Sequence, residues 1–202
     1  MHTNSRLLFQ KYAKQHFCPG LRVLEIGPDG TPSTYQKAVD DSSIVWHTLD
    51  IRDDPALTYR ALSEYEFPIE SDSYDIVLSG QVIEHVRQIW VWIRELARVC
   101  KVGGLVVTVN PVSWPYHEAP VDCWRVFPEG MKALYEYASL QVKSSLCESL
   151  EVSGQRTHIP GRSAEWQPPR LQLAYKVLGL VGFPIECAYD VITVGEKVSA
   201  PF

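Results

Sequence analysis

The chain has 202 residues, of which 46% are hydrophobic and 21% are charged, enough to bury one sizeable core but few for two. We therefore expect a single domain over residues 1–202. The formal charge is −5, from 19 Lys and Arg against 24 Asp and Glu, and no cluster of basic residues stands out. This pattern argues against a nucleic-acid partner, which requires a basic stripe along its phosphates.

Cysteine usage and hydropathy predict a soluble, cytoplasmic protein. The five cysteines are odd in number, widely spaced and without a C-x-x-C pair, which favours buried thiols in a reducing compartment over disulfides or structural zinc. The N-terminal residues lack an apolar signal core, and the longest apolar run, residues 171–183, is interrupted and too short to cross a bilayer. We therefore expect no membrane partner.

Short apolar strands alternate with helices along the first half of the chain. Residues 4–16 have helical spacing, and Thr31–Asp40 predicts a second helix with Thr31 as its N-cap and Pro32 at its first position. Residues 89–100 predict a third helix. The predicted strands are residues 21–27, 44–51, 57–62, 73–79 and 105–110. This alternation indicates an α/β fold with a doubly wound sheet.

The third predicted helix should bury one face and stop at a pair of glycines. Its expected inward residues are Trp90, Ile93, Leu96, Ala97 and Cys100. Lys101–Gly104 then supplies a cation and two glycines, which favour a C-terminal stop.

The back half of the sequence is less regular. It predicts a helix at residues 129–139, a strand at 140–151, a helix at 170–181 and a last strand at 189–197. We expect residues 1–110 to form the cofactor-binding half and residues 111–202 the acceptor-binding half of the domain.

The stretch Val23–Gly30 ends an apolar strand in a turn that carries two glycines. A dinucleotide-binding turn needs glycine at its first, third and sixth positions, which here are Gly27, Asp29 and Pro32. Asp29 would repel a pyrophosphate, and Pro32 has no N–H to donate. The turn therefore disfavours NAD.

Two carboxylates at neighbouring strand ends favour a cofactor with positive charge. Glu25 lies near the end of the first predicted strand, where it can attract a cation while Gly27 and Gly30 let the chain pass close to it. Asp50 ends the second strand, where its carboxylate can accept hydrogen bonds from both hydroxyls of a ribose. S-adenosylmethionine, with an amine, a sulfonium and a ribose, meets both requirements.

Five segments make the chain resemble the class I S-adenosylmethionine-dependent methyltransferases of the small-molecule, methyltransferase type 11 kind. In order they are VLEIGPDG (23–30), HTLDI (47–51), FPIESDSYDIVLS (67–79), VIEHV (82–86) and LARVCKVGG (96–104). The resemblance implies a Rossmann-like seven-stranded sheet with an antiparallel last strand. It also implies S-adenosyl-L-methionine as the cofactor, bound by Glu25, Gly27, Pro28, Asp29, Gly30, Asp50, Ile51, Leu62, Ser63, Ser79, Gly80 and Gln81.

The sequence departs from the family pattern at two places. Pro32 and Ser33 replace the third glycine of the usual turn, and the acid that often follows the third strand is missing or shifted to Glu64. The sequence therefore does not identify the residues that recognise adenine.

Methyl transfer to a hydroxyl needs a base, whereas transfer to a neutral amine does not. His85 begins a helix after the fourth strand and is expected to face the methyl donor, with capping or packing of that helix as the alternative. His117 and Asp122 are the other candidate bases. We expect O-methylation of a sugar-like or secondary-metabolite molecule, with N-methylation of a small amine or a non-catalytic binding subunit as alternatives.

The segment Trp114–Arg125 gathers aromatic, acidic and basic residues just after the fifth strand. Aromatic rings that stack beside polar groups that orient a ligand are typical of sites for ring-bearing molecules. The alternative is a folded loop in which the Trp residues fill the core and Asp122 pairs with Arg125. The candidate acceptor-binding residues are Tyr35, His85, Trp114, Tyr116, His117, Trp124 and Arg125.

We expect no metal and leave the oligomeric state open. The conceivable ligands form no i,i+4 pair or tight cluster in the sequence; they are His47, His117, His158, Asp122 and Glu118. The apolar stripe within residues 171–181 is most simply core, with a homodimer face or a lid over the substrate as alternatives.

Overall fold

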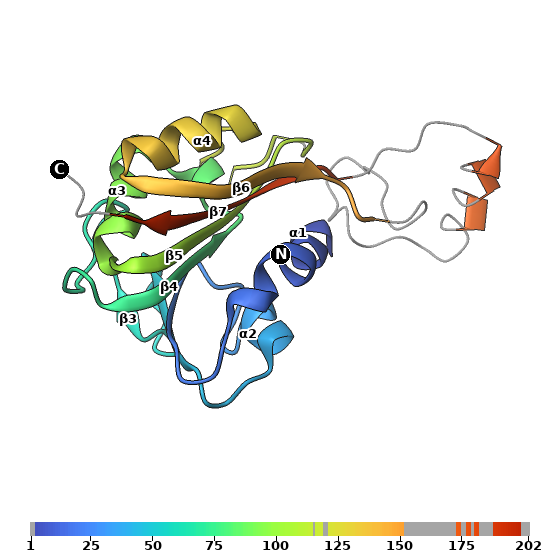
Figure 1. The fold of residues 1–202 in the computed structure, drawn as a ribbon. Coiled ribbons are helices and arrows are strands. Elements are labelled where there is room, and N and C mark those ends of the chain that lie inside the picture. The colour runs from blue at the N-terminus through green and yellow to red at the C-terminus, as the bar shows by residue number, and fades with distance from the viewer. Residues whose placement is uncertain are drawn as a thin grey trace.

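A seven-stranded sheet forms the centre of the computed structural model (Figure 1), which describes residues 3–114, 116–118, 121–151, 173–174, 177–178, 180–181 and 188–198. The strands are β1 Arg22–Ile26, β2 Val45–Asp50, β3 Tyr59–Arg60, β4 Tyr74–Gly80, β5 Cys100–Pro111, β6 Leu140–Glu148 and β7 Asp190–Lys197. Their order is β3-β2-β1-β4-β5-β7-β6, and β7 runs antiparallel to both of its neighbours. The predicted doubly wound sheet with an antiparallel last strand is confirmed.

Helices cover both faces of the sheet. The described helical segments are α1 Thr3–Leu8, η1 Phe9–Ala13, η2 Lys14–His16, α2 Thr34–Val39, η3 Ile83–His85, α3 Ile89–Val99 and α4 Pro128–Tyr137. In Figure 1, α1 and α2 lie on one side of the sheet, and α3 and α4 lie on the other. No helix of the described residues is long and apolar enough to span a membrane.

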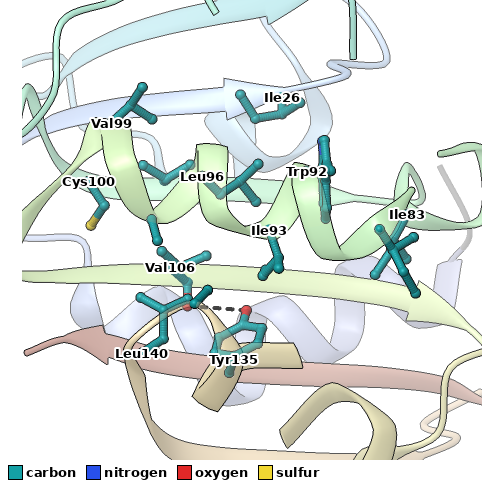
Figure 2. Packing of buried hydrophobic residues seen from close by; sticks show 14 of the residues in the cluster. Ile26, Ile83, Trp92, Ile93, Leu96, Val99, Cys100, Val106, Tyr135 and Leu140 are labelled. Atoms are coloured by element: carbon teal, nitrogen blue, oxygen red, sulfur yellow. Dashed lines mark hydrogen bonds between the residues drawn. The ribbon is translucent and has the colours of Figure 1, made fainter. Parts of the chain in front are cut away.

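The central strands read as continuous apolar runs because both of their faces are buried. Val106 of β5 faces the cluster under α3 and α4, whereas its neighbour Val107 faces the cluster under α1 and α2. Figure 2 shows Trp92 and Leu96 of α3 among this first cluster, with Tyr135 of α4 beside Val106. Successive side chains of a strand point to opposite faces, so each strand serves two cores.

The first turn of α2 begins later than the sequence predicts. The N-cap is Ser33, whose Oγ accepts a hydrogen bond from the Gln36 N–H at 3.0 Å, and the helix starts at Thr34. The expected N-cap Thr31 and first residue Pro32 instead belong to the turn, and a cis peptide joins them. The prediction failed because both Thr31 and Ser33 are able to cap a helix, and Ser is the better N-cap of the two residue types.

Helix α3 buries a different face near its start. Trp92 is buried, while Trp90, predicted to face inward, is 43% exposed. The expected stop at Lys101–Gly104 is also wrong, because these residues already belong to β5. Gly103 adopts a left-handed φ of +80° there. The register between β4 and β5 shifts nearby, between Tyr74 and Ile76, so Gly103 allows a β-bulge-like irregularity rather than ending a helix.

The remaining predictions hold in part. Strand β6 ends at Glu148 rather than at residue 151. Most of the predicted helix 170–181 lies outside the described residues; 173–174, 177–178 and 180 are helical. Cys100 is buried, but Cys18, Cys123 and Cys147 are exposed, so the expectation of buried thiols is wrong for these three.

Candidate functional site

A cavity of about 540 Å³ opens where β1 and β2 end. Parallel strands of an open α/β sheet bind ligands at this edge, and the volume lies within the range of about 300–1,000 Å³ common for small-molecule sites. We call it the main cavity. It is lined by Ile26, Gly27, Pro28, Asp29, Leu49, Asp50, Ile51, Arg52, Glu64, Phe67, Gln81, Val82, His85, Val86 and Trp92.

Gly27 makes the turn after β1 possible. Its φ of +67° lies in the left-handed region, and its N–H donates to the Leu49 carbonyl at 2.9 Å. A Cβ added at this position would run into the side chain of Val82. Only glycine satisfies both conditions, so the chain can pass close to whatever fills the cavity.

Asp50 and Arg52 join the end of β2 to this turn. Oδ2 of Asp50 accepts a hydrogen bond from Nε of Arg52 at 2.7 Å, and Nη2 of Arg52 donates to the Pro28 carbonyl at 2.8 Å. The sequence prediction included Asp50 but missed Arg52, because an Arg just beyond a strand carries no pattern that marks it as a lining residue.

Asp29 is held by the start of α2. Its two carboxylate oxygens accept from the backbone N–H of Thr34 at 2.8 Å and from the Thr34 hydroxyl at 2.6 Å. Partial burial opposes ionisation of Asp29, but these hydrogen bonds outweigh it and lower the pKa. The turn therefore presents a fixed negative charge at the rim of the main cavity.

Glu25 is buried beneath the turn and does not line the main cavity. Its Oε2 accepts from the Ser33 hydroxyl at 2.5 Å and from Nε1 of Trp46 at 2.8 Å. Burial raises the pKa of Glu25 to about 7, and the two hydrogen bonds offset part of that rise. Side chains alternate along a strand, so Glu25 shares the face of Val23 rather than the open strand end.

Other residues expected to contact the cofactor also lie outside the lining. Gly30 and Ser63 are not among it, and Leu62 is 96% exposed, whereas the next acid, Glu64, does line the main cavity. Ser79 is buried in β4. The shift toward Glu64 considered from the sequence thus agrees with the geometry.

Gly80 and Tyr35 form a buried contact rather than a ligand surface. A Cβ at Gly80 would collide with the Tyr35 ring, which is buried and lies 4.7 Å, centroid to centroid, from the ring of Phe9. Gln81, the next residue, does line the main cavity and donates from Nε2 to Asp190 at 3.1 Å. Tyr35, a candidate acceptor-binding residue from the sequence, is packed in the core and does not line the main cavity.

The apolar wall of the main cavity was not predicted as such. It comes from β1, β2, the β3–β4 connection, the β4–α3 connection and α3, and consists of Ile26, Leu49, Phe67, Val82, Val86 and Trp92. These positions read from the sequence as ordinary core, and periodicity does not distinguish a core residue from one that lines a buried ligand site.

His85 combines access to the main cavity with a fixed ring orientation. Nδ1 lies 2.5 Å from the Val121 carbonyl, which can only accept, so Nδ1 carries the proton and Nε2 keeps its lone pair. Nε2 is 3.8 Å from Oε1 of Glu84. A histidine held in this tautomer can accept a proton or bind a cation through Nε2.

Three hydrogen bonds join the connection after β4 to the connection after β5. Besides the His85–Val121 bond, the Cys123 N–H donates to the Glu84 carbonyl at 2.7 Å, and Nε1 of Trp124 donates to the Val86 carbonyl at 2.9 Å. We call these three bonds the loop junction. The loop junction keeps the aromatic segment, which is Trp114–Arg125, against the main cavity.

The aromatic segment forms a second, shallower cavity of about 320 Å³. We call it the aromatic cleft; it is lined by Trp114, Tyr116, Asp122, Cys123, Trp124 and Arg125. The described part of the predicted acceptor segment thus comes together, apart from His117, whose ring lies 5.1 Å from that of His85.

Asp122 holds this cleft in shape. Its side chain is 2% exposed, and its oxygens accept two hydrogen bonds from Arg125, at 2.5 and 2.7 Å, and one from the His117 N–H at 2.9 Å. Burial opposes ionisation, but the bonds from Arg125 and His117 outweigh it and lower the pKa of Asp122. A carboxylate so engaged is a poor proton acceptor, which favours the structural alternative for Asp122.

Glu84 was missed by the sequence prediction although it lies beside His85. Its side chain is 1% exposed, and burial raises its pKa to about 8. Glu84, His85 and His117 each offer a ligand atom within 4.8 Å of the others. The expectation that no tight cluster of metal-binding residues forms is therefore wrong for the described residues; the sequence did not associate Glu84 and His85 with the distant His117.

Comparison with known sequences places the middle of the chain in a protein family. Residues 32–108 match the sequence model of a family described as "Methyltransferase domain". An uncharacterized methyltransferase of Mycobacterium bovis is 34% identical over 99 residues, which make up 44% of this chain and 38% of that protein. The matching region thus spans well under half of this relative.

Solved structures share the fold over nearly the whole chain. A SAM-dependent methyltransferase of Archaeoglobus fulgidus superposes with a TM-score of 0.61 at 15% identity, covering 95% of this chain and 94% of that one. A phosphoethanolamine N-methyltransferase of Haemonchus contortus, solved with S-adenosyl-L-methionine, gives 0.59 at 14% identity, covering 98% of this chain and 53% of that one. At such identities the likeness shows the fold alone.

Proposed function

We propose that the chain is a class I S-adenosylmethionine-dependent methyltransferase, which binds S-adenosylmethionine in the main cavity and transfers its methyl group to a hydroxyl of a small molecule. The observation that carries the proposal is that Gly27 and Asp50, at the ends of the neighbouring strands β1 and β2, both line the main cavity. The first lets a ligand approach the backbone, and the second offers a carboxylate to a ribose.

The residues of the main cavity fit the cofactor. Asp29 supplies negative charge for the amine end, and the half-buried carboxylate of Asp50 can receive ribose hydroxyls. The apolar wall near Ile51 and Leu49 suits an adenine ring. Glu25 supports the turn from beneath and contributes to binding through Ser33 rather than by contact.

The chain's own residues then have to position the acceptor and receive a proton. When bound, S-adenosylmethionine supplies a methyl group already activated by its sulfonium, so catalysis depends mainly on orientation and on exclusion of water. A hydroxyl acceptor loses its proton during the transfer. Nε2 of His85 is the proposed acceptor of this proton, because His85 lines the main cavity and the Val121 carbonyl fixes the orientation of its ring.

The acceptor is proposed to bind in the aromatic cleft. Trp114, Tyr116 and Trp124 offer rings for stacking, and the guanidinium of Arg125, which donates to Asp122, lines the same cleft. Because the loop junction holds this cleft beside His85, a sugar-like or other ring-bearing molecule bound there lies next to the proposed base.

Binding of S-adenosylhomocysteine tests the cofactor proposal. We expect Asp50→Ala to weaken its affinity at least tenfold in calorimetry, because the carboxylate loses its hydrogen bonds to the ribose. Asp53→Ala is the matched control, since Asp53 lies just beyond the same strand but is exposed and pairs with Arg60. Equal affinity in wild type and Asp50→Ala, or tight binding of NADH instead, would refute the proposal.

A screen of hydroxyl and amine compounds for methyl uptake tests the acceptor class. On a hydroxyl acceptor, His85→Ala should lower turnover at least tenfold, since general-base catalysis is typically worth about 10²–10⁴. If the active compounds are neutral amines and His85→Ala leaves their turnover unchanged, the protein is an N-methyltransferase. Cofactor binding without any methyl uptake would point to a non-catalytic binding subunit.

A further inference from the structure

Three side chains from two distant segments converge beside the main cavity. Glu84 and His85 belong to η3, and His117 comes from the connection after β5. Their ligand atoms lie within 4.8 Å of one another. We propose that Glu84, His85 and His117 bind a divalent transition-metal cation of the Zn²⁺ type.

Glu84 is the strongest reason to expect a cation. Within the part of the chain that the structure describes, its buried Oε2 has no hydrogen-bond partner. Because buried polar groups are normally satisfied, an unpartnered oxygen on a buried carboxylate beside two imidazoles is explained by a positive ion between these side chains.

Both histidines are oriented in the way metal-ligating histidines usually are. Such a residue gives its second ring nitrogen to a carbonyl or carboxylate, which fixes the ring. Nδ1 of His85 is bonded to the Val121 carbonyl, and Nδ1 of His117 lies 3.4 Å from Oδ2 of Asp122. Asp122 is itself fixed by Arg125, so the second layer of contacts is already in place.

The donor set selects the class of cation. Two imidazole nitrogens and one carboxylate suit Zn²⁺, Co²⁺ or Fe²⁺, whereas Mg²⁺ prefers oxygen ligands throughout. Three protein ligands leave a position open, as in catalytic rather than structural sites. Because His85 also lines the main cavity, a water or an acceptor hydroxyl can take that position.

A cation at Nε2 of His85 gives this residue a different part in the reaction. A proton and a metal compete for the same lone pair, so a metal-bound His85 would not act as the base; the cation would instead make a coordinated hydroxyl more acidic, so that its proton would pass to solvent water. This role toward an acceptor rests on the proposed methyl transfer, whereas cation binding itself does not.

Calorimetry with Zn²⁺ on the metal-free full chain tests the site. We expect one Zn²⁺ per chain and an affinity at least tenfold lower in Glu84→Gln and in His117→Ala, each of which removes one ligand. His16→Ala is the matched control and should bind like wild type, because His16 lies in η2, away from the cluster. Thermal unfolding of each variant checks that it is folded. Because two ligand variants are measured, the test still holds if one of them fails to fold.

Three outcomes would overturn the site: no saturable Zn²⁺ binding, wild-type affinity in both ligand variants, or thiolate charge-transfer absorption in the Co²⁺ complex. The last would assign the metal to a cysteine such as the exposed Cys123. Binding of S-adenosylhomocysteine is measured separately on the same samples. Failure of the proposed function and failure of the cation site are therefore read independently.

Discussion

At the scale of single residues, Glu25 shows how a side chain can serve a site that it does not touch. Its carboxyl is shared between Ser33, which caps α2, and Trp46 of β2. The turn that shapes the main cavity lies directly above this contact. The residue therefore connects β1, β2 and α2, and its protonation state affects the stability of the whole corner.

The raised pKa of Glu25 predicts a pH-dependent stability. The folded-state pKa is about 7 against an ordinary value of 4.5, so between these pH values the folded chain keeps a proton that the unfolded chain has lost. Glu25 alone should then lower the free energy of unfolding by about 3 kcal/mol as pH rises through this window, and the value should stay lower above it. Urea unfolding at pH 5, 6, 7 and 8 measures it.

Glu25→Gln should make this slope shallower by the part that Glu25 contributes, because its amide does not titrate while its oxygen can still accept from Ser33 and Trp46. Glu84, whose pKa is also raised by burial, keeps its own contribution in both proteins. The variant should match or fall below wild type near pH 5 and exceed it near pH 8. Glu66→Gln, at an exposed position, is the matched control and should keep the wild-type slope. A wild-type slope in Glu25→Gln would contradict the assignment.

At the scale of elements, the sequence predicted the strands better than the helix ends. β1, β4 and β5 are apolar on both faces, and such runs are readable without knowledge of the fold. Helix ends depend on which of several neighbouring residues caps the first turn, and Ser33 rather than Thr31 does so in α2. Local chemistry decides such boundaries, and short patterns do not resolve it.

The residues of the candidate site also divide into those that the sequence predicted and those that it did not. Gly27 and Asp50 were predictable, because a turn glycine and an acid at a strand end have recognisable positions. Arg52 and Glu84 were not, because their partners are carbonyls and side chains brought close only by folding. Glu25 was predicted to attract the cofactor at the strand end, whereas its side chain is buried and bonded to Ser33.

The loop junction predicts a measurable loss when one of its bonds is removed. Trp124→Phe keeps an aromatic ring but leaves the Val86 carbonyl without its donor. The free energy of unfolding should fall by about 1–2 kcal/mol, and limited proteolysis between residues 112 and 127 should become faster. Trp90→Phe, at a half-exposed position of α3, is the control. Equal stability and equal cleavage in the two variants would show that the bond does not hold the loop.

At the scale of the whole molecule, different lines of reasoning predicted the sheet and its topology. Alternating strands and helices indicate a doubly wound α/β sheet, but they do not set the direction of the last strand. That detail came from the family resemblance, and β7 is indeed antiparallel. The single domain over residues 1–202 and its division at residue 110 stay predictions, as does a homodimer through residues 171–181.

Strands β6 and β7 are neighbours in the sheet, yet residues 149–189 separate them along the chain. Glu148, the last residue of β6, pairs with Asp190, the first of β7, so the chain leaves and re-enters the sheet at one place. Closure entropy grows slowly with loop length, so a segment whose ends already meet can be exchanged with little effect on the sheet. Asp190 also accepts a hydrogen bond from Gln81 of the main cavity. Exchange of residues 149–189 is therefore expected to change the surroundings of the main cavity without rebuilding the sheet.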